Sequence, residues 1–338
     1  MNVEIRSLCG PLTEEQVGWI VDLYGPVDAK YRSARYVRHQ FVDNPFGWSV
    51  NVFAVDGGRA VGHCGVIPFR ATRDSRSFVA GKLEALAVDA AYRGRRAEDG
   101  GSVATDILVR LYPFAVENGM ELVFGLAPPP VARIHVRASC HLVPTNAPAY
   151  TSVVDVESFA GPDGSWKRRI GAYGLAGVQR AILAPFPASS SLGKPGDEDA
   201  DLASVADGRH GWTVSGADSW TWFAGSGVLR ALALDDGTRA LVRLDDSHAT
   251  TVQIIAWRPR SPGLRAALRL LAAASALARS HRAPTLRFQP WRGGAAEAVL
   301  ARACVLAGFV RRPEADLLLF PDAAQPDVRL TPFFYATF

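Results

Sequence analysis

One stretch of this chain occurs twice. VFAVDGGRAVG at residues 52–62 has a counterpart in LALDDGTRALV at 232–242, with Asp, Gly, Arg and Ala at the same spacing. Two further pairs follow the same order, namely SARYVRHQF (33–41) with SGADSWTWF (215–223), and VRASCHL (136–142) with ARACVLAGF (301–309). A repeat of this length is typical of a duplicated domain and not of a solenoid.

The repeat sets the expected domain boundaries. A chain of 338 residues with 48% hydrophobic residues can bury two cores of ordinary size. We expect a first domain at 1–155, a second and degenerate one at 211–325, and a tail at 326–338. Residues 156–210 hold an apolar helical segment and then FPASSSLGKPGDEDADL, whose Ser, Pro, Gly and acidic residues are typical of an exposed connector.

The first copy contains the elements of an α/β fold. Alternating apolar residues on both sides of an Asp-Gly-Gly turn predict a hairpin over 49–69. A strand at 82–89, a helix from Ser102 to Asn118-Gly119 and a buried strand at 121–127 follow. This order predicts a βαβ unit within a mixed β-sheet flanked by helices, once in each domain.

Charge and cysteine content argue against several classes of protein. The 37 basic and 33 acidic residues leave a net charge of +4, without the basic stripe of a nucleic-acid-binding protein. The four cysteines are scattered and form no C-x-x-C pair, so we expect neither a zinc site nor a disulfide framework. The longest apolar stretch carries two arginines, so we expect a cytoplasmic protein with no membrane partner.

A basic, glycine-bearing turn, AYRGRRAEDGGS (91–102), lies between the strand at 82–89 and the next helix. Such a turn presents backbone N–H groups at a helix start, which suits an anion. It lacks the Gly-Lys-Ser/Thr ending of a P-loop and the Gly-x-Gly-x-x-Gly of a dinucleotide fold. The array LEALAVDAAYRGR, then Gly-Ser and a helix, resembles instead the pyrophosphate turn of the GNAT superfamily of acyl-coenzyme A N-acyltransferases.

The resemblance covers residues 30–150 well and 215–320 more loosely, so the chain resembles a tandem GNAT protein. The turn departs from the family pattern, because Arg96, Ala97 and Glu98 look like an insertion and Asp99 replaces the usual glycine. The alternative is a plain loop in which Asp99 or Ser102 caps the helix.

The second copy has a turn that suits an anion less well. Pro259 and Pro262 each remove one backbone N–H from it. We therefore assign acyl-coenzyme A to the first copy alone.

The resemblance implies acetyl-CoA or another acyl-CoA as co-substrate, and no metal. In the family, backbone amides of the central strand serve the pantetheine arm and the oxyanion, and the turn holds the pyrophosphate. The residues that this assigns to acyl-CoA are Leu86, Ala87, Val88, Arg93, Gly94, Arg95, Arg96, Gly100, Gly101 and Ser102.

Four further residues are candidates for catalysis or acceptor binding. Glu84 matches the position of the family's general base, or it faces solvent on an alternating strand. His135 matches the tyrosine that acts as general acid, or it is a surface histidine. His39 and Asn44 lie in a segment that approaches the acceptor in the family, although DNPFG is also a turn that satisfies its own backbone. A Cys140–His acyl-enzyme is a remote alternative.

These features favour an N-acyltransferase that acts on a small-molecule primary amine by direct attack in a ternary complex, as a monomer or homodimer. The resemblance implies an amino sugar, possibly linked to a nucleotide, as acceptor. A non-catalytic scaffold is one alternative. Aminoacyl transfer from charged tRNA is another, although the long helical arm and basic face of such enzymes are not evident.

Overall fold

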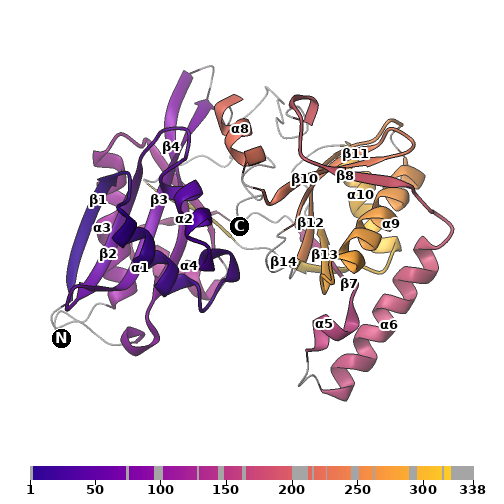
Figure 1. The fold of residues 1–338 in the computed structure, drawn as a ribbon, viewed down its shortest axis with the longest axis horizontal. Coiled ribbons are helices and arrows are strands. Elements are labelled where there is room, and N and C mark those ends of the chain that lie inside the picture. Colours follow the sequence, from indigo (N-terminus) through magenta and orange to yellow (C-terminus); the bar gives the residue numbers. More distant parts are fainter. Residues whose placement is uncertain are drawn as a thin grey trace. The chain divides into compact units, whose positions relative to one another are not determined.

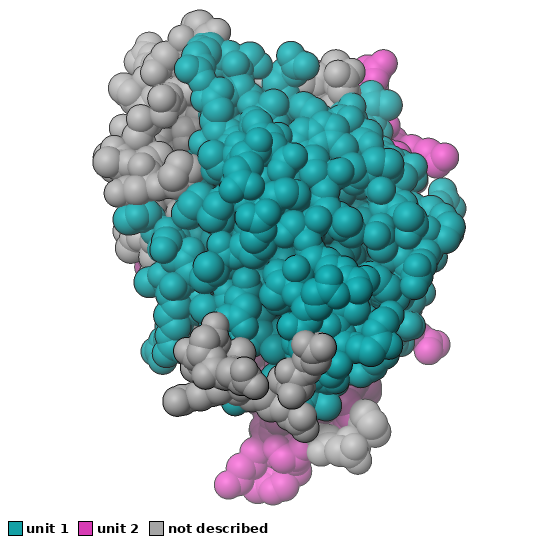
Figure 2. Space-filling view, turned by 90° about the vertical axis from the view of Figure 1, so that its left-hand side faces the viewer, with its two compact units in different colours: residues 1–145, 209–222, 315–328 teal, residues 146–208, 223–314, 329–338 magenta. Residues whose placement is uncertain are grey.

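The computed structural model describes the chain except at residues 1–2, 74–75, 95–101, 128, 144–147, 162–164, 200–211, 215–216, 226, 245–250, 262, 289–294, 314–315 and 321–338. The chain forms two compact units, coloured teal and magenta in Figure 2. Unit 1 comprises residues 1–145, 209–222 and 315–328, and unit 2 comprises 146–208, 223–314 and 329–338. Each unit has its own mixed sheet.

Unit 1 is built on an eight-stranded sheet of order β1-β2-β3-β4-β5-β15-β6, with β9 beside β3. Its strands are β1 (Glu4–Gly10), β2 (Ser49–Asp56), β3 (Arg59–Arg73), β4 (Arg76–Val88), β5 (Leu122–Ala127), β6 (His141–Val143), β9 (Trp212–Val214) and β15 (Asp316–Phe320). The expected hairpin is β2–β3, and its turn uses Gly57 and Gly58 at φ +58° and +79°, which glycine adopts without strain. Of the described pairs in this sheet, β4 with β5 is parallel.

Helices cover both faces of this sheet (Figure 1). They are α1 (Glu14–Tyr24), η1 (Ala29–Arg32), α2 (Ala34–Phe41), η2 (Ala90–Tyr92), α3 (Val103–Glu117) and α4 (Pro129–Arg137). Because side chains alternate along a strand, Ala54 packs in one core with Ile107 of α3, whereas Phe53 contacts Trp19 of α1. The predicted helix from Ser102 is α3, and it stops before Gly119 at φ +88°.

Unit 2 is built on a seven-stranded sheet of order β14-β7-β13-β12-β11-β10-β8. Its strands are β7 (Pro148–Val153), β8 (Ser190–Gly193), β10 (Leu229–Leu234), β11 (Arg239–Arg243), β12 (Thr251–Arg258), β13 (Thr285–Phe288) and β14 (Val310–Pro313). Its helices are α5 (Val156–Ala160), α6 (Trp166–Leu183), η3 (Asp197–Asp199), α9 (Leu264–Ser280) and α10 (Ala295–Leu306), while α8 (Ala217–Gly225) carries the chain from unit 1 to unit 2. As in unit 1, a hairpin (β10–β11) precedes a strand and its parallel neighbour, here β12 and β13.

The units do not follow the expected boundaries, because the chain exchanges strands between them. Strand β7 lies before residue 155 but pairs with β13 and β14 of unit 2. Strand β15 lies within the expected second domain but pairs with β5 and β6 of unit 1. Within 156–210, the expected connector, α5, α6 and β8 belong to unit 2.

Gly81 of β4 sits where no side chain fits, and this gives a test of the central strand. A Cβ there would lie 2.4 Å from both Met120 Sδ and Val66 Cγ1. We expect Gly81→Ala to lower the free energy of unfolding by about 1–3 kcal/mol, because Val66 is stiff and an overpacked core must shift. Gly18→Ala, in α1 with open space around it, is the control and should stabilise the helix slightly. Equal urea midpoints for the two variants would contradict this packing.

Candidate functional site

The central feature of unit 1 is the point at which β4 leaves β5. The parallel ladder between them is confined to Ala80–Lys82 of β4. On the other side, Gly65 of β3 pairs with Glu84 and Cys64 pairs with Leu86, so Ala85 is the extra residue of a β-bulge. In the described part of the chain, residues 83–88 therefore pair with β3 alone, and their backbone edge toward β5 is open.

The open edge runs into the turn that the sequence singles out. Arg93 Nε donates to the carbonyl of Val88 at 2.8 Å, and Gly94 has φ +71°. Ser102 caps α3 by accepting from the backbone N–H of Thr105 at 3.3 Å. Arg95, Arg96, Gly100 and Gly101, which were assigned to acyl-CoA, lie outside the described residues, as does Asp99.

The strand residues assigned to the pantetheine arm lie on the open segment. Leu86, Ala87 and Val88 pair with Cys64, His63 and Gly62 of β3. Leu86 is half-buried against the core that β4 shares with α3, whereas Ala87 and Val88 are buried.

Glu84 does not face solvent, so that alternative is wrong. Its side chain is 3% exposed and pairs with Lys82 Nζ, itself 1% exposed. Its other oxygen accepts from the Tyr31 hydroxyl at 2.7 Å. Burial raises the pKa of Glu84, but Lys82, Lys30 and the two hydrogen bonds outweigh burial and hold the pKa below its usual value. The carboxylate is ionised at neutral pH.

The segment η1–α2 brings aromatic and cationic side chains beside Glu84. Tyr31 is buried and stacks on Tyr24 with ring centroids 4.8 Å apart, and Tyr36 meets it edge-on at 5.3 Å. The Lys30 ammonium lies over the rings of Tyr31 and Tyr36 at 5.2 and 5.7 Å. Burial first, and then the charge of Glu84, raise the pKa of Tyr31 far above its usual value, so its hydroxyl keeps its proton.

A buried histidine, His63, packs against Tyr24 of this cluster. His63 Nδ1 is 3.0 Å from the Tyr24 hydroxyl, and Nε2 is 3.0 Å from Asn51 Oδ1. Because Asn51 Oδ1 only accepts, Nε2 carries the proton, while the Tyr24 hydroxyl donates to the His63 carbonyl at 2.7 Å. Burial lowers the pKa of His63 to about 3, so the ring is neutral.

His135 is not a surface residue. It is 1% exposed, and its Nδ1 lies 2.5 Å from the Tyr112 hydroxyl of α3. Burial lowers the pKa of His135 to about 4, so the ring is uncharged at neutral pH. It is therefore not the imidazolium that would protonate a departing thiolate. Cys140 is also buried, and burial raises the pKa of its thiol to about 12, which argues against an acyl-enzyme.

Of the two expected acceptor residues, Asn44 is engaged within the protein, whereas His39 Nε2 is buried without a hydrogen-bond partner among the described residues. Asn44 is 4% exposed, its amide donates to the Trp48 carbonyl, and its oxygen accepts from Phe46 N–H. Asn44 therefore satisfies the backbone of its own turn, which is the alternative that the sequence DNPFG offered. The His39 ring stacks on Trp222 at 5.1 Å, and its carbonyl accepts from Trp222 Nε1.

Unit 2 repeats the bulge but not the chemistry. Leu241 pairs with Ala256 and Val242 with Ile254, so Ile255 is the extra residue just after the parallel ladder to β13. The residues beside this bulge are apolar, and none of them is a carboxylate that matches Glu84. Pro259 directly follows β12, and α9 begins without a side-chain cap. Pro262 is outside the described residues.

Sequence reasoning missed Lys82 and Tyr31 as partners of Glu84. Lys82 could have been found, because residues two apart on a strand share a face, so Lys82 and Glu84 had to be neighbours. Tyr31 gave no such signal, since its contact with Glu84 joins positions 53 apart in sequence. Among the described residues, no group of His, Cys, Asp or Glu could hold a metal ion, and no helix is long and apolar enough to cross a membrane.

No family model matches the sequence, and no curated protein matches it. Solved structures do match. A tandem GNAT protein from the clavulanic acid biosynthesis pathway is 14% identical with a TM-score of 0.56, over 94% of this chain and 98% of that one.

Two further structures are similar at the same level. N-myristoyltransferase from Saccharomyces cerevisiae, solved with myristoyl-CoA, is 11% identical with a TM-score of 0.57, over 96% of this chain and 81% of that one. A GCN5-related N-acetyltransferase from Kribbella flavida is 13% identical with a TM-score of 0.52, over 94% and 71%. At such identities the likeness concerns the fold alone, which is two units, each a mixed sheet flanked by helices, as in the tandem GNAT protein.

Proposed function

We propose that unit 1 is an N-acyltransferase that moves an acyl group from an acyl-CoA thioester to the primary amine of a small molecule. The observation that carries this proposal is the open edge of β4 from Leu83 to Val88, created by the end of the ladder at Lys82 and by the bulge at Ala85. This edge leads into the described start of the turn, η2 and Gly94, and α3 begins at Val103. The strand edge and the N-terminus of α3 thus offer backbone donors and acceptors on either side of the turn.

An acyl-CoA is chemically complementary to the strand edge and the helix N-terminus. The pantetheine arm is a chain of amides and can pair with an open strand edge as another strand would. The N-terminus of α3, capped by Ser102, favours the negative charge of a pyrophosphate. Gly94 at φ +71° lets the chain turn between the two. When bound, the thioester supplies the activated acyl group.

The chain's own contribution is to stabilise charge as the amine attacks. Backbone N–H groups at the open edge can donate to the carbonyl oxygen as it becomes negative. Glu84 is a poor general base, because a carboxylate with a low pKa takes a proton weakly. We therefore give Glu84 a positioning role, in which it orients the Tyr31 hydroxyl and the Lys82 ammonium near this edge.

The proposed acceptor is a primary amine. The amino sugar that the resemblance implies has no separate support, because Asn44, one of its two expected contacts, is engaged within the protein. The experiment that tests the proposed function is transfer from acetyl-CoA to a panel of amines that contains amino sugars, nucleotide-linked amino sugars and polyamines. Release of free thiol that depends on the amine is the expected result.

A glycine substitution tests whether the turn binds the co-substrate. Gly94→Ala places a Cβ in open space but at φ +71°, which costs about 1–2 kcal/mol for a non-glycine residue and so distorts the turn. Gly57→Ala imposes a similar strain at φ +58° in the β2–β3 hairpin and is the matched control. We expect calorimetric titration with acetyl-CoA to show an affinity at least about tenfold weaker for Gly94→Ala only.

The titration also separates the proposal from its alternatives. Equal acetyl-CoA affinities for the two glycine variants would exclude the turn from the binding site. The absence of both heat and thermal stabilisation with the unmodified protein at millimolar acetyl-CoA would favour a non-catalytic scaffold.

A further inference from the structure

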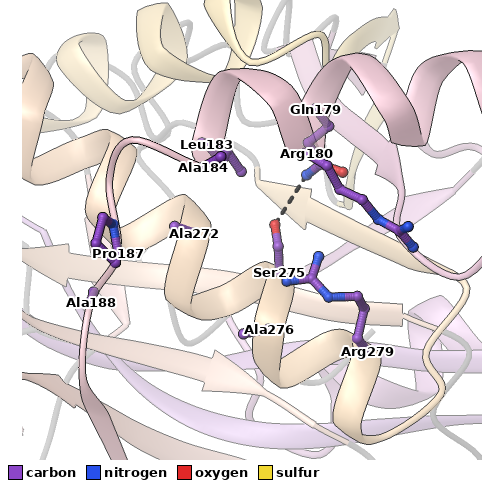
Figure 3. Close-up of a pocket in the computed structure, with 10 residues that line it drawn as sticks. All are labelled: Gln179, Arg180, Leu183, Ala184, Pro187, Ala188, Ala272, Ser275, Ala276 and Arg279. Atoms are coloured by element: carbon purple, nitrogen blue, oxygen red, sulfur yellow. Dashed lines mark hydrogen bonds between the residues drawn. The ribbon is translucent and has the colours of Figure 1, made fainter.

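A pocket in unit 2 lies between α6 and α9, and none of its lining residues belongs to β12. Its volume is about 380 Å³, within the range of sites for small molecules. One wall comes from the end of α6 and the residues that follow it, up to Ala188, and the other comes from α9 (Figure 3).

The pocket exists because α9 presents small side chains toward α6. Ala272, Ser275 and Ala276 follow one another at helical spacing on one face of α9, and all three line the pocket. None is large enough to fill the space between the helices. Ala184 and Ala188 repeat this property on the opposite wall.

The floor of the pocket is fixed and partly polar. Leu183 is buried there and provides an apolar surface. Beside it, Gln179 Nε2 donates to Ser275 Oγ at 3.0 Å, and both residues are buried (Figure 3). This bond joins α6 and α9 beside the pocket.

Two arginines stand at the rim, one from each helix. Arg180 and Arg279 both line the pocket, and no ion pair with a described carboxylate involves either of them. Partial burial first, and then the like charge of Arg180, lower the pKa of Arg279. Two guanidinium groups that repel each other beside an apolar surface attract an anion, and their planar forks match a carboxylate or a phosphate.

We propose that this pocket binds a small amphiphilic anion, whose carboxylate or phosphate group lies between Arg180 and Arg279 and whose apolar part packs on Leu183 and the alanines. The site is separate from the proposed transferase site. It does not depend on that function, because binding is measured directly.

Titration calorimetry of the full chain with octanoate and with octyl phosphate tests the site. We expect one saturable site, with affinity reduced about tenfold or more in Arg180→Gln and in Arg279→Gln, since each loses a charge-assisted hydrogen bond. Arg265→Gln removes the same charge from an exposed position on α9 outside the pocket and is the matched control. Its affinity should equal that of the unmodified protein.

A filling variant separates the pocket from a general effect of charge. Ala276→Leu keeps both arginines but occupies the space between the helices, so we expect it to abolish binding of both probes. The proposal is overturned if neither probe binds at millimolar concentration, if the three arginine variants bind alike, or if Ala276→Leu binds as the unmodified protein does.

Discussion

Glu84→Gln should lower the free energy of unfolding by about 3–5 kcal/mol, because it leaves the buried ammonium of Lys82 without the carboxylate that neutralises it. The side chain of Lys82 is 1% exposed, so water cannot solvate the ammonium in place of the lost carboxylate. Urea unfolding followed by circular dichroism measures the effect. The variant Glu121→Gln breaks the exposed pair with Arg76 and should cost no more than about 1 kcal/mol.

A double variant shows whether the charge or the shape of Glu84 matters. Lys82→Met with Glu84→Gln removes both charges and should recover most of the lost stability, since replacing a whole buried pair is often neutral. This variant also allows a fair measurement of turnover. If its turnover per folded molecule and its KM for acetyl-CoA match those of the unmodified protein, Glu84 has no part in the reaction; if Glu84→Gln costs no more than Glu121→Gln, the buried pair is refuted.

Acidification from pH 8 to pH 5 should lower the free energy of unfolding by about 4 kcal/mol. Burial in the folded chain holds the pKa of His63 at about 3 and that of His135 at about 4, whereas an exposed imidazole has a pKa of 6.5. The unfolded chain therefore takes up protons first, and stability that is complete above pH 6.5 is lost as the pH falls. At pH 5 each ring contributes about 2 kcal/mol to the loss.

Variants assign this slope to the two rings. His135→Gln should remove about half of the loss between pH 8 and pH 5, whatever its own cost to stability, because the slope counts protons and not contacts. His281→Gln, at an exposed position, is the control. Glu84 does not contribute in this window, since its lowered pKa confines its effect to more acidic pH. An unchanged slope in His135→Gln would contradict the buried, neutral imidazole.

Local signals were sufficient to predict the core elements of unit 1. The Asp-Gly-Gly turn fixed the β2–β3 hairpin, and helical spacing after Ser102 with a stop at Gly119 fixed α3. The repeat predicted a second sheet of the same kind, which is present. These features depend on contacts near in sequence, where periodicity and turn chemistry are informative.

The environment of the site depends on contacts that periodicity does not encode. Alternation predicts that Glu84 lies on one face of β4. It does not predict the helices that cover both faces of this central strand and bury Glu84. For the same reason His135 could be read as exposed, although Tyr112 of α3 covers it. Strand β7 pairs with β13, and β15 pairs with β5. Each pair joins segments more than a hundred residues apart, and the sequence of neither strand indicates which strand it pairs with.

The strand exchange has a consequence for how this protein can be made. The sheet of unit 1 receives β15, at residues 316–320, between β5 and β6. A ribosome must therefore synthesise the chain past residue 320 before that sheet can close, and until then the edges of β5 and β6 stay available to other strands. A gene truncated after residue 145 would encode these unpaired edges permanently, so a soluble first half should require β15 to be joined to it.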